Sequence, residues 1–209
     1  MKQINKITII LVIFAVVFVG LLYIGALSAE HEASNEPYVS AYFDPDTVNT
    51  VKITMSDDNW NDMLENPLEE EYRLCSIEIN GDTYDGVGIR PKGNMSLSMV
   101  ASSDSDRYSF KVKSDEYVTD QTFKGLTKFV LNNCIDDATY MKECLSYQMM
   151  TELGVPTPLF SYAAVYINGE YYGLYLMLET VEDDFAQRNF GADYGNLYKP
   201  ETMRMGGSM

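Results

Sequence analysis

One stretch decides the fold: Ser161-Tyr-Ala-Ala-Val-Tyr-Ile167, then Asn168-Gly169, then Tyr171-Tyr-Gly-Leu-Tyr-Leu-Met-Leu-Glu179. Both arms are rich in the β-branched and aromatic residues that favour strands. Asn and Gly tolerate the positive φ angles that a type I′ turn requires at its two central positions. The stretch therefore predicts two antiparallel strands joined by a tight turn.

The same pattern occurs once more upstream. Tyr72 to Ile79 and Thr83 to Arg90 flank a second Asn-Gly turn, Asn80-Gly81, and predict another hairpin. Apolar and polar residues alternate over 51–55, which is the period of a half-buried strand. Two more segments, 108–113 and 126–132, complete the set of candidate strands.

Three segments have helical patterns. Ser56 or Asp57 can cap a short helix that stops before Pro67. From about Thr139 to Leu153 apolar residues recur every four positions, and a last amphipathic stretch covers 181–190. The order of elements predicts an α+β fold with a mostly antiparallel sheet and one helix that crosses between its middle and last strands.

The N-terminal segment differs in composition from the rest. Residues 7–27 carry no charge, and about 20 apolar residues suffice to span a bilayer as a helix. We therefore expect residues 1–29 to be a signal anchor, with a cleaved signal peptide as the alternative. Lys2 and Lys6 would keep the N-terminus in the cytoplasm and the domain outside. Polar residues 30–46 are interpreted as a tether from the membrane to the domain. The alternative to a membrane-anchored domain is a secreted or spore-coat location.

Composition excludes several functions. The 209 residues have a formal net charge of −16, which repels nucleic-acid phosphates, so we expect no nucleic-acid partner. His31 is the only histidine, which argues against a His/Cys zinc site or a Ser-His-Asp triad. Cys75, Cys134 and Cys144 are either buried thiols or one disulfide plus a free thiol. Glu69 to Glu71 predict a solvated loop face, with calcium binding as a remote alternative.

The predicted order of elements is also the plan of the small lobe of a protein kinase. Lys111 lies on a strand upstream of the long helix and Glu143 in that helix's first turns, where they could form the ion pair that holds ATP phosphates in kinases. Arg90-Pro-Lys-Gly-Asn-Met-Ser96 joins two strands and combines cations, a glycine and hydroxyls that suit a polyphosphate. Each feature also has an ordinary interpretation: a solvent-facing lysine, an exposed helical glutamate and a plain loop.

Together, several segments resemble the spore coat protein H (CotH) kinase family, in the correct order from about residue 47 to 200. They are residues 90–96, 109–113, 140–147 with 153–156, 165–179 and 195–199. The family has an atypical protein-kinase-like fold and uses ATP and a divalent metal to phosphorylate serines, in spore-forming bacteria on coat proteins. The resemblance implies a kinase-like small lobe over 47–200, ATP as cofactor, and a serine-containing coat or surface protein as substrate.

Carried over by position, the resemblance implies a nucleotide-binding set. Lys111 resembles the phosphate-binding lysine, with Lys113 as the alternative, and residues 178–181 resemble the hinge that binds adenine. The full set is Arg90, Lys92, Gly93, Lys111, Glu143, Glu179 and Val181.

The chain departs from the family in its second half. The family's catalytic and metal-binding aspartates lie in segments such as H-N-Y-Y-L-Y and P-W-D, which do not occur here. We therefore expect a truncated large lobe, with the catalytic groups and the Mg²⁺ ion or other divalent metal held downstream of Met209, and residues 201–209 as the flexible start of a missing insert. The rival hypothesis is a membrane-anchored, non-catalytic surface binding or structural module. A transporter or receptor subunit has only the apolar segment in its favour.

Overall fold

The computed structural model of this protein describes residues 2–29 and 36–199, and the side chains of residues 8–21 and 36–199. Two compact units divide the chain, residues 1–35 and 36–209. The first unit contains one helix, α1 (Lys2–Ala29). The second contains all the other elements. The expected tail over 201–209 and the first part of the expected tether, residues 30–35, lie outside the described residues.

The membrane-spanning helix predicted over residues 7–27 is not supported. Among the residues that the structure describes, no helix has both the length and the apolar character to cross a bilayer.

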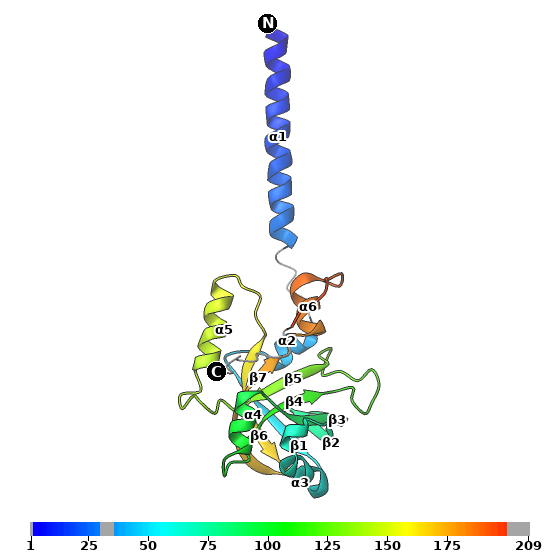
Figure 1. Ribbon diagram of the computed structural model, residues 1–209. Coiled ribbons are helices and arrows are strands. Elements are labelled where there is room, and N and C mark those ends of the chain that lie inside the picture. The colour runs from blue at the N-terminus through cyan, green and yellow to red at the C-terminus, as the bar shows by residue number, and fades with distance from the viewer. Residues whose placement is uncertain (1, 30–35, 200–209) are drawn as a thin grey trace, which may run out of the picture. The chain divides into compact units, whose positions relative to one another are not determined.

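The second unit is a closed barrel of seven strands (Figure 1). The strands follow one another around the barrel in the order β1-β2-β3-β4-β5-β7-β6. Neighbouring strands are antiparallel except β1 and β6, which pair in parallel and close the ring. Their bounds are β1 (Val48–Thr54), β2 (Arg73–Ile79), β3 (Asp82–Lys92), β4 (Ser109–Lys113), β5 (Lys128–Asn132), β6 (Phe160–Ile167) and β7 (Glu170–Glu179).

This closure corrects the predicted fold class. The sequence predicts a kinase-like small lobe, a sheet with one crossing helix, whereas the structure has a closed barrel with few helices. The physical reason is the placement of β1. It pairs with β2 along one edge and with β6 along the other, so the described sheet has no free edge. β1 and β6 are more than 100 residues apart in the sequence, so no local pattern indicates that they pair.

The two predicted hairpins are confirmed. Asn80 and Gly81 have φ angles of 52° and 96°, and Asn168 and Gly169 have 49° and 90°. All four residues thus adopt the left-handed conformation that an Asn-Gly turn supplies. The Asn168 side chain also accepts a hydrogen bond from the backbone N–H of Met55 at 3.0 Å, which ties this turn to the end of β1.

Helices surround the barrel. The structure confirms a short helix capped by Ser56, whose side chain accepts from the N–H of Asn59. Two of the α-helices were not predicted. One is α2, within the residues assigned to the tether, where Tyr38 and Tyr42 are only 1% exposed; the other is α4, within a segment expected to be a loop. The helices of this unit are α2 (Pro37–Tyr42), α3 (Asp57–Glu65), the 3-10 helix η1 (Pro67–Glu69), α4 (Met95–Ala101), α5 (Lys142–Glu152) and α6 (Asp183–Phe190).

The strands have apolar side chains on both faces, in two separate clusters. Phe129 and Leu131 of β5 belong to the large cluster that fills the barrel. Val130 lies between them and belongs to a small second cluster. Because successive side chains of a strand point to opposite faces, the second cluster lies on the outer face. It contains Val130, Cys144, Leu176 and Leu178, of which Cys144 comes from α5. Cys75, Cys134 and Cys144 are free thiols.

Candidate functional site

A cavity of about 740 Å³ lies against the outer face of the barrel. All seven residues of the predicted nucleotide-binding set line it. The described lining residues are Glu70, Arg90, Lys92, Gly93, Asn94, Lys111, Val130, Asn132, Glu143, Tyr147, Pro158, Leu178, Glu179, Thr180, Val181, Glu182 and Lys199.

The barrel wall supplies a continuous row of side chains to this cavity. Arg90 of β3 pairs with Lys111 of β4, Lys111 with Val130 of β5, and Val130 with Leu178 of β7. Directly paired residues on adjacent strands have side chains about 5 Å apart on the same face. Their sequence neighbours Ile89 and Phe110 fill the barrel interior, which fixes the row on the outside. The row is therefore cationic at one end and apolar at the other.

The cationic end contains ion pairs that sequence reasoning missed. Lys111 Nζ contacts Glu182 Oε1 at 2.5 Å, and Lys128 Nζ contacts the other carboxylate oxygen at 2.9 Å. Burial opposes ionisation of Glu182, but hydrogen bonds from both lysines outweigh it and lower the pKa of Glu182 to about 2. Arg90 pairs with Glu70, and its guanidinium carbon lies 5.4 Å from the centre of the Tyr72 ring, a cation–π distance.

The expected ion pair between Lys111 and Glu143 is replaced by a different network. Lys92 donates to the side-chain oxygen of Asn132 at 3.2 Å, and the amide nitrogen of Asn132 donates to both oxygens of Glu143, at 3.0 and 2.9 Å. Burial lowers the pKa of Lys92, which nearby Glu143 partly opposes. Asn132 therefore connects the cation and the carboxylate indirectly.

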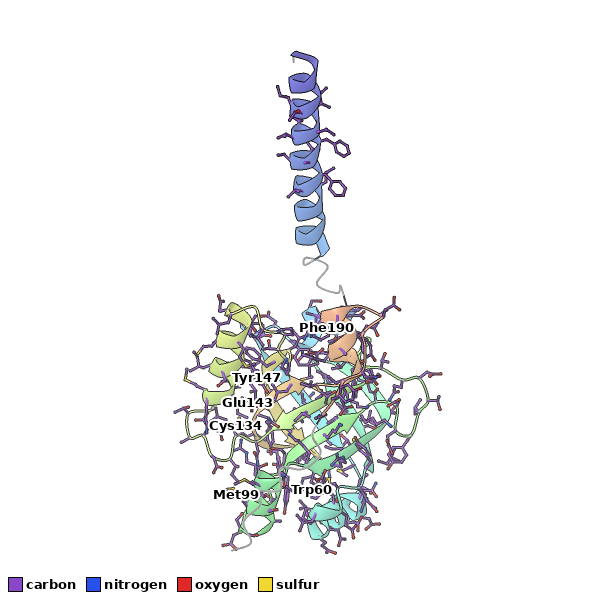
Figure 2. All side chains as sticks on the ribbon, turned by 45° about the horizontal axis from the view of Figure 1, so that its top comes forward. Trp60, Met99, Cys134, Glu143, Tyr147 and Phe190 are labelled. Carbon is purple, nitrogen blue, oxygen red and sulfur yellow. The ribbon has the colours of Figure 1, made fainter. Side chains whose placement is uncertain are left out.

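Helix α5 contributes both Glu143 and Tyr147 to this wall, one turn apart (Figure 2). The Tyr147 hydroxyl donates to Glu143 Oε1 at 3.3 Å. Burial and the charge of Glu143 raise the pKa of Tyr147 to about 12, so this hydroxyl stays a proton donor at neutral pH.

The structure separates the two candidate lysines of β4. Lys111 lines the cavity, whereas Lys113 pairs with Asp115 and Glu116 at 3.7 and 2.8 Å. Lys113 is not among the cavity residues. The choice of Lys111 over Lys113 thus agrees with the geometry.

Gly93 lies at the turn from β3 into α4. Its φ is +127°, and a Cβ atom there would lie 2.4 Å from Ser96 Oγ and 3.2 Å from the backbone N of Leu97. A side chain is excluded by contact with α4 and by backbone strain. The glycine of the segment 90–96 therefore allows α4 to begin directly beside the cavity.

The predicted hinge residues fall into two groups. Glu179 is fully buried and pairs with Arg188 of α6 at 2.6 Å; it also accepts from the Tyr38 hydroxyl and the N–H of Leu159. These contacts give Glu179 a structural role at the barrel rim. Thr180, which follows it, is 6% exposed, and its hydroxyl has no hydrogen-bond partner. Such a hydroxyl is an exception to the rule that buried polar groups are hydrogen-bonded.

Sequence reasoning missed Glu70, Asn132, Tyr147 and Glu182 as members of this site. Asn132 and Tyr147 carry a detectable signal, since Asn132 ends a candidate strand on the same face as Val130, and Tyr147 follows Glu143 by one helical turn. Glu70 and Glu182 lie in connecting segments, whose direction no periodicity specifies.

The donor set does not fit a metal ion. Among the described residues, no group of three or more His, Cys, Asp or Glu side chains is arranged to hold one. The site therefore combines cations, carboxylates and an apolar wall in one cavity on the outer face of the barrel.

Comparison with known proteins assigns the family. The model of the CotH kinase protein family matches residues 89–208, which is more than half of the chain. The chain therefore belongs to the CotH kinase protein family. It is also 33% identical over 78 residues to the inner spore coat protein H of Bacillus subtilis (strain 168). That match covers 37% of this chain and 22% of the relative, so it concerns a minor part of the longer protein.

Proposed function

We propose that this chain carries the nucleotide-binding part of a CotH-like protein kinase, which transfers phosphate from ATP to serines of coat or surface proteins. Family membership supports the class. The observation that carries the proposal is the row Arg90, Lys111, Val130 and Leu178, because its cationic and apolar ends match the two ends of a nucleotide.

The phosphate end of the proposed site consists of Arg90, Lys92 and Lys111. In a chain with a net charge of −16, these three cations lie within three aligned positions of two strands. Such a concentration of cationic side chains favours a polyanionic ligand. Arg90 suits a planar, two-pronged contact with phosphate oxygens, whereas the lysines act as point charges.

The base end of the proposed site consists of Val130, Leu178 and Tyr147, with Thr180 and Val181 at the edge. Apolar walls with a few polar groups are typical of cofactor sites. The unpartnered Thr180 hydroxyl supplies a donor or acceptor for a heteroatom of the base. The cavity of about 740 Å³ lies within the usual range of ligand pockets, roughly 300–1,000 Å³.

We assign binding, and not phosphate transfer, to the described residues. Transfer requires carboxylates that hold the metal ion and position the acceptor hydroxyl, and the described side chains form no such set. In the proposed kinase those groups come from outside the described residues. A coat or surface location follows from the name of the Bacillus subtilis relative, an inner spore coat protein.

The direct test is stabilisation of the protein by ATP. A ligand that binds only the folded state at 100 times its dissociation constant adds about 2.7 kcal/mol to the free energy of unfolding. We expect ATP to raise the melting temperature of the wild type and of Lys113→Ala, and to leave that of Lys111→Ala unchanged. Lys113→Ala is the matched control because it removes a lysine from the same strand face outside the cavity.

A second candidate is a non-catalytic binding module of the coat or cell surface. It is favoured by the carboxylates that already neutralise Arg90 and Lys111. The same experiment separates the two functions, because this module predicts no ATP-dependent rise in any variant.

A further inference from the structure

Two cations lie side by side on the outer face of the barrel wall, and each has its own carboxylate. Arg90 and Lys111 are direct partners on β3 and β4, a placement that is destabilising for like charges. Glu70 contacts Arg90 and Glu182 contacts Lys111. The protein therefore supplies, from two connecting segments, the negative charge that a bound polyphosphate would otherwise bring.

The two carboxylates are held to different degrees. Glu182 bridges two lysines and its side chain is 24% exposed. Glu70 contacts one cation and its side chain is 37% exposed. Glu70 also has a φ of +53°, a left-handed conformation that is uncommon for residues other than glycine. Glu70 is thus the carboxylate that can leave at lower cost.

The three consecutive glutamates do not form the single solvated face that the sequence predicts. Glu69 and Glu71 pair with Arg73, at 3.9 and 3.1 Å, and their side chains are 56% and 67% exposed. Glu70 alone lines the cavity. The end of η1 and the two residues that follow it therefore direct Glu70 onto the cavity and leave Glu69 and Glu71 outside.

We infer that Glu70 is an internal anionic ligand of Arg90, which an incoming phosphate group displaces. This inference rests on the proposed function of the cavity as a polyphosphate site. Glu70 then lowers the affinity of every anion that contacts Arg90, because that anion must first break the ion pair between Arg90 and Glu70. It acts as a specificity residue, because only a ligand with several negative charges recovers that free energy from Lys92 and Lys111 as well.

The test compares two neighbouring glutamates. Glu70→Gln keeps the size of the side chain and removes its charge at the cavity, and Glu71→Gln removes the same charge outside it. The full 209-residue chain is titrated with inorganic tripolyphosphate by calorimetry, without divalent metal. The anion no longer has to displace a charge-assisted, partly exposed contact, so we expect Glu70→Gln to bind about tenfold more tightly than the wild type. Glu71→Gln should match the wild type within about twofold.

The outcomes separate this inference from the proposed function. Tighter binding by Glu70→Gln than by Glu71→Gln supports the inference, and binding by Glu70→Gln alone supports it as well. Equal binding by all three proteins overturns the inference while the cavity keeps its proposed role as a polyphosphate site. No binding by any of them overturns both, since removal of an internal competitor should reveal even a weak site.

Discussion

The barrel wall and helix α5 contain similar apolar residues but bury them to different extents. Leu131 of β5 and Met177 of β7 are completely buried, whereas Leu145 of α5 is 44% exposed and Leu153, just after its end, is 77% exposed. Cys144 is the only buried residue of α5. The barrel has an interior in which apolar side chains can pack on all sides, while α5 has only the small outer cluster beneath it. Stability therefore resides in the barrel, and α5 mainly presents Glu143 and Tyr147 to the cavity.

The largest expected effect concerns the ion pair at the barrel rim. Arg188→Ala leaves the carboxylate of Glu179, whose side chain is 0% exposed, without its cation. Removal of one partner of a buried pair costs about 3–5 kcal/mol. Urea denaturation should show a loss of that size in the free energy of unfolding. The control is Lys52→Ala, which removes the ion pair between Lys52 and Glu78. The Lys52 side chain is 50% exposed, so its loss should cost at most about 1 kcal/mol. A loss for Arg188→Ala no larger than that of the control contradicts the assignment.

A matched pair of leucines tests the comparison itself. Leu131→Ala creates a cavity in the barrel interior and should cost about 2–5 kcal/mol. Leu153→Ala removes an exposed side chain and should stay within about 0.5 kcal/mol of the wild type. Both values come from chemical denaturation. Similar losses in the two variants would show that the face of α5 is covered in solution.

The cavity wall should respond to pH with a defined sign. The folded-state pKa of Glu182, about 2, lies below its ordinary value of 4.5. The ion pairs of Glu182 therefore stabilise the fold fully above about pH 4.5 and are lost as the pH falls toward 2. We expect wild type to be more stable than Glu182→Gln at pH 7, and the difference to close over that interval. A difference that does not change between pH 7 and pH 2 contradicts the ion pairs.

The smallest expected effect lies in the hairpin turn that connects β6 and β7. Asn168→Ala places alanine at a φ of +49°, a backbone conformation that alanine adopts less readily than asparagine or glycine. The substitution also removes the hydrogen bond that the Asn168 side chain accepts from the N–H of Met55. Together these changes should cost about 1–2 kcal/mol. Asn168→Gly loses the same hydrogen bond without the backbone strain, so thermal denaturation should give it the smaller loss.

Local sequence was sufficient for the strands and for the cations of the site. Asn80-Gly81 and Asn168-Gly169 specify their turns through backbone conformation alone. Alternation along β3 and β4 places Arg90, Lys92 and Lys111 on one face, and the family resemblance indicates which face matters. These signals act over a few residues, and the structure agrees with them.

The remainder depends on contacts between distant segments. Glu182 and Glu70 approach the cations from loops, and Arg188 reaches Glu179 from a helix whose placement no pattern specifies. The barrel itself was missed for the same reason, because its closure depends on the pairing of β1 with β6. The carboxylates that neutralise the site could therefore be found only in three dimensions.

The parallel pairing of β1 with β6 also has a consequence for the order of assembly. β1 precedes the other barrel strands in the sequence, yet one of its two partners, residues 160–167, follows most of the barrel. Contacts between segments distant in sequence slow the folding of β proteins. During synthesis the edge of β1 must wait unpaired, and an exposed strand edge is prone to pair with other chains. Pairing of β6 with β1 therefore covers that edge in the same step that closes the barrel.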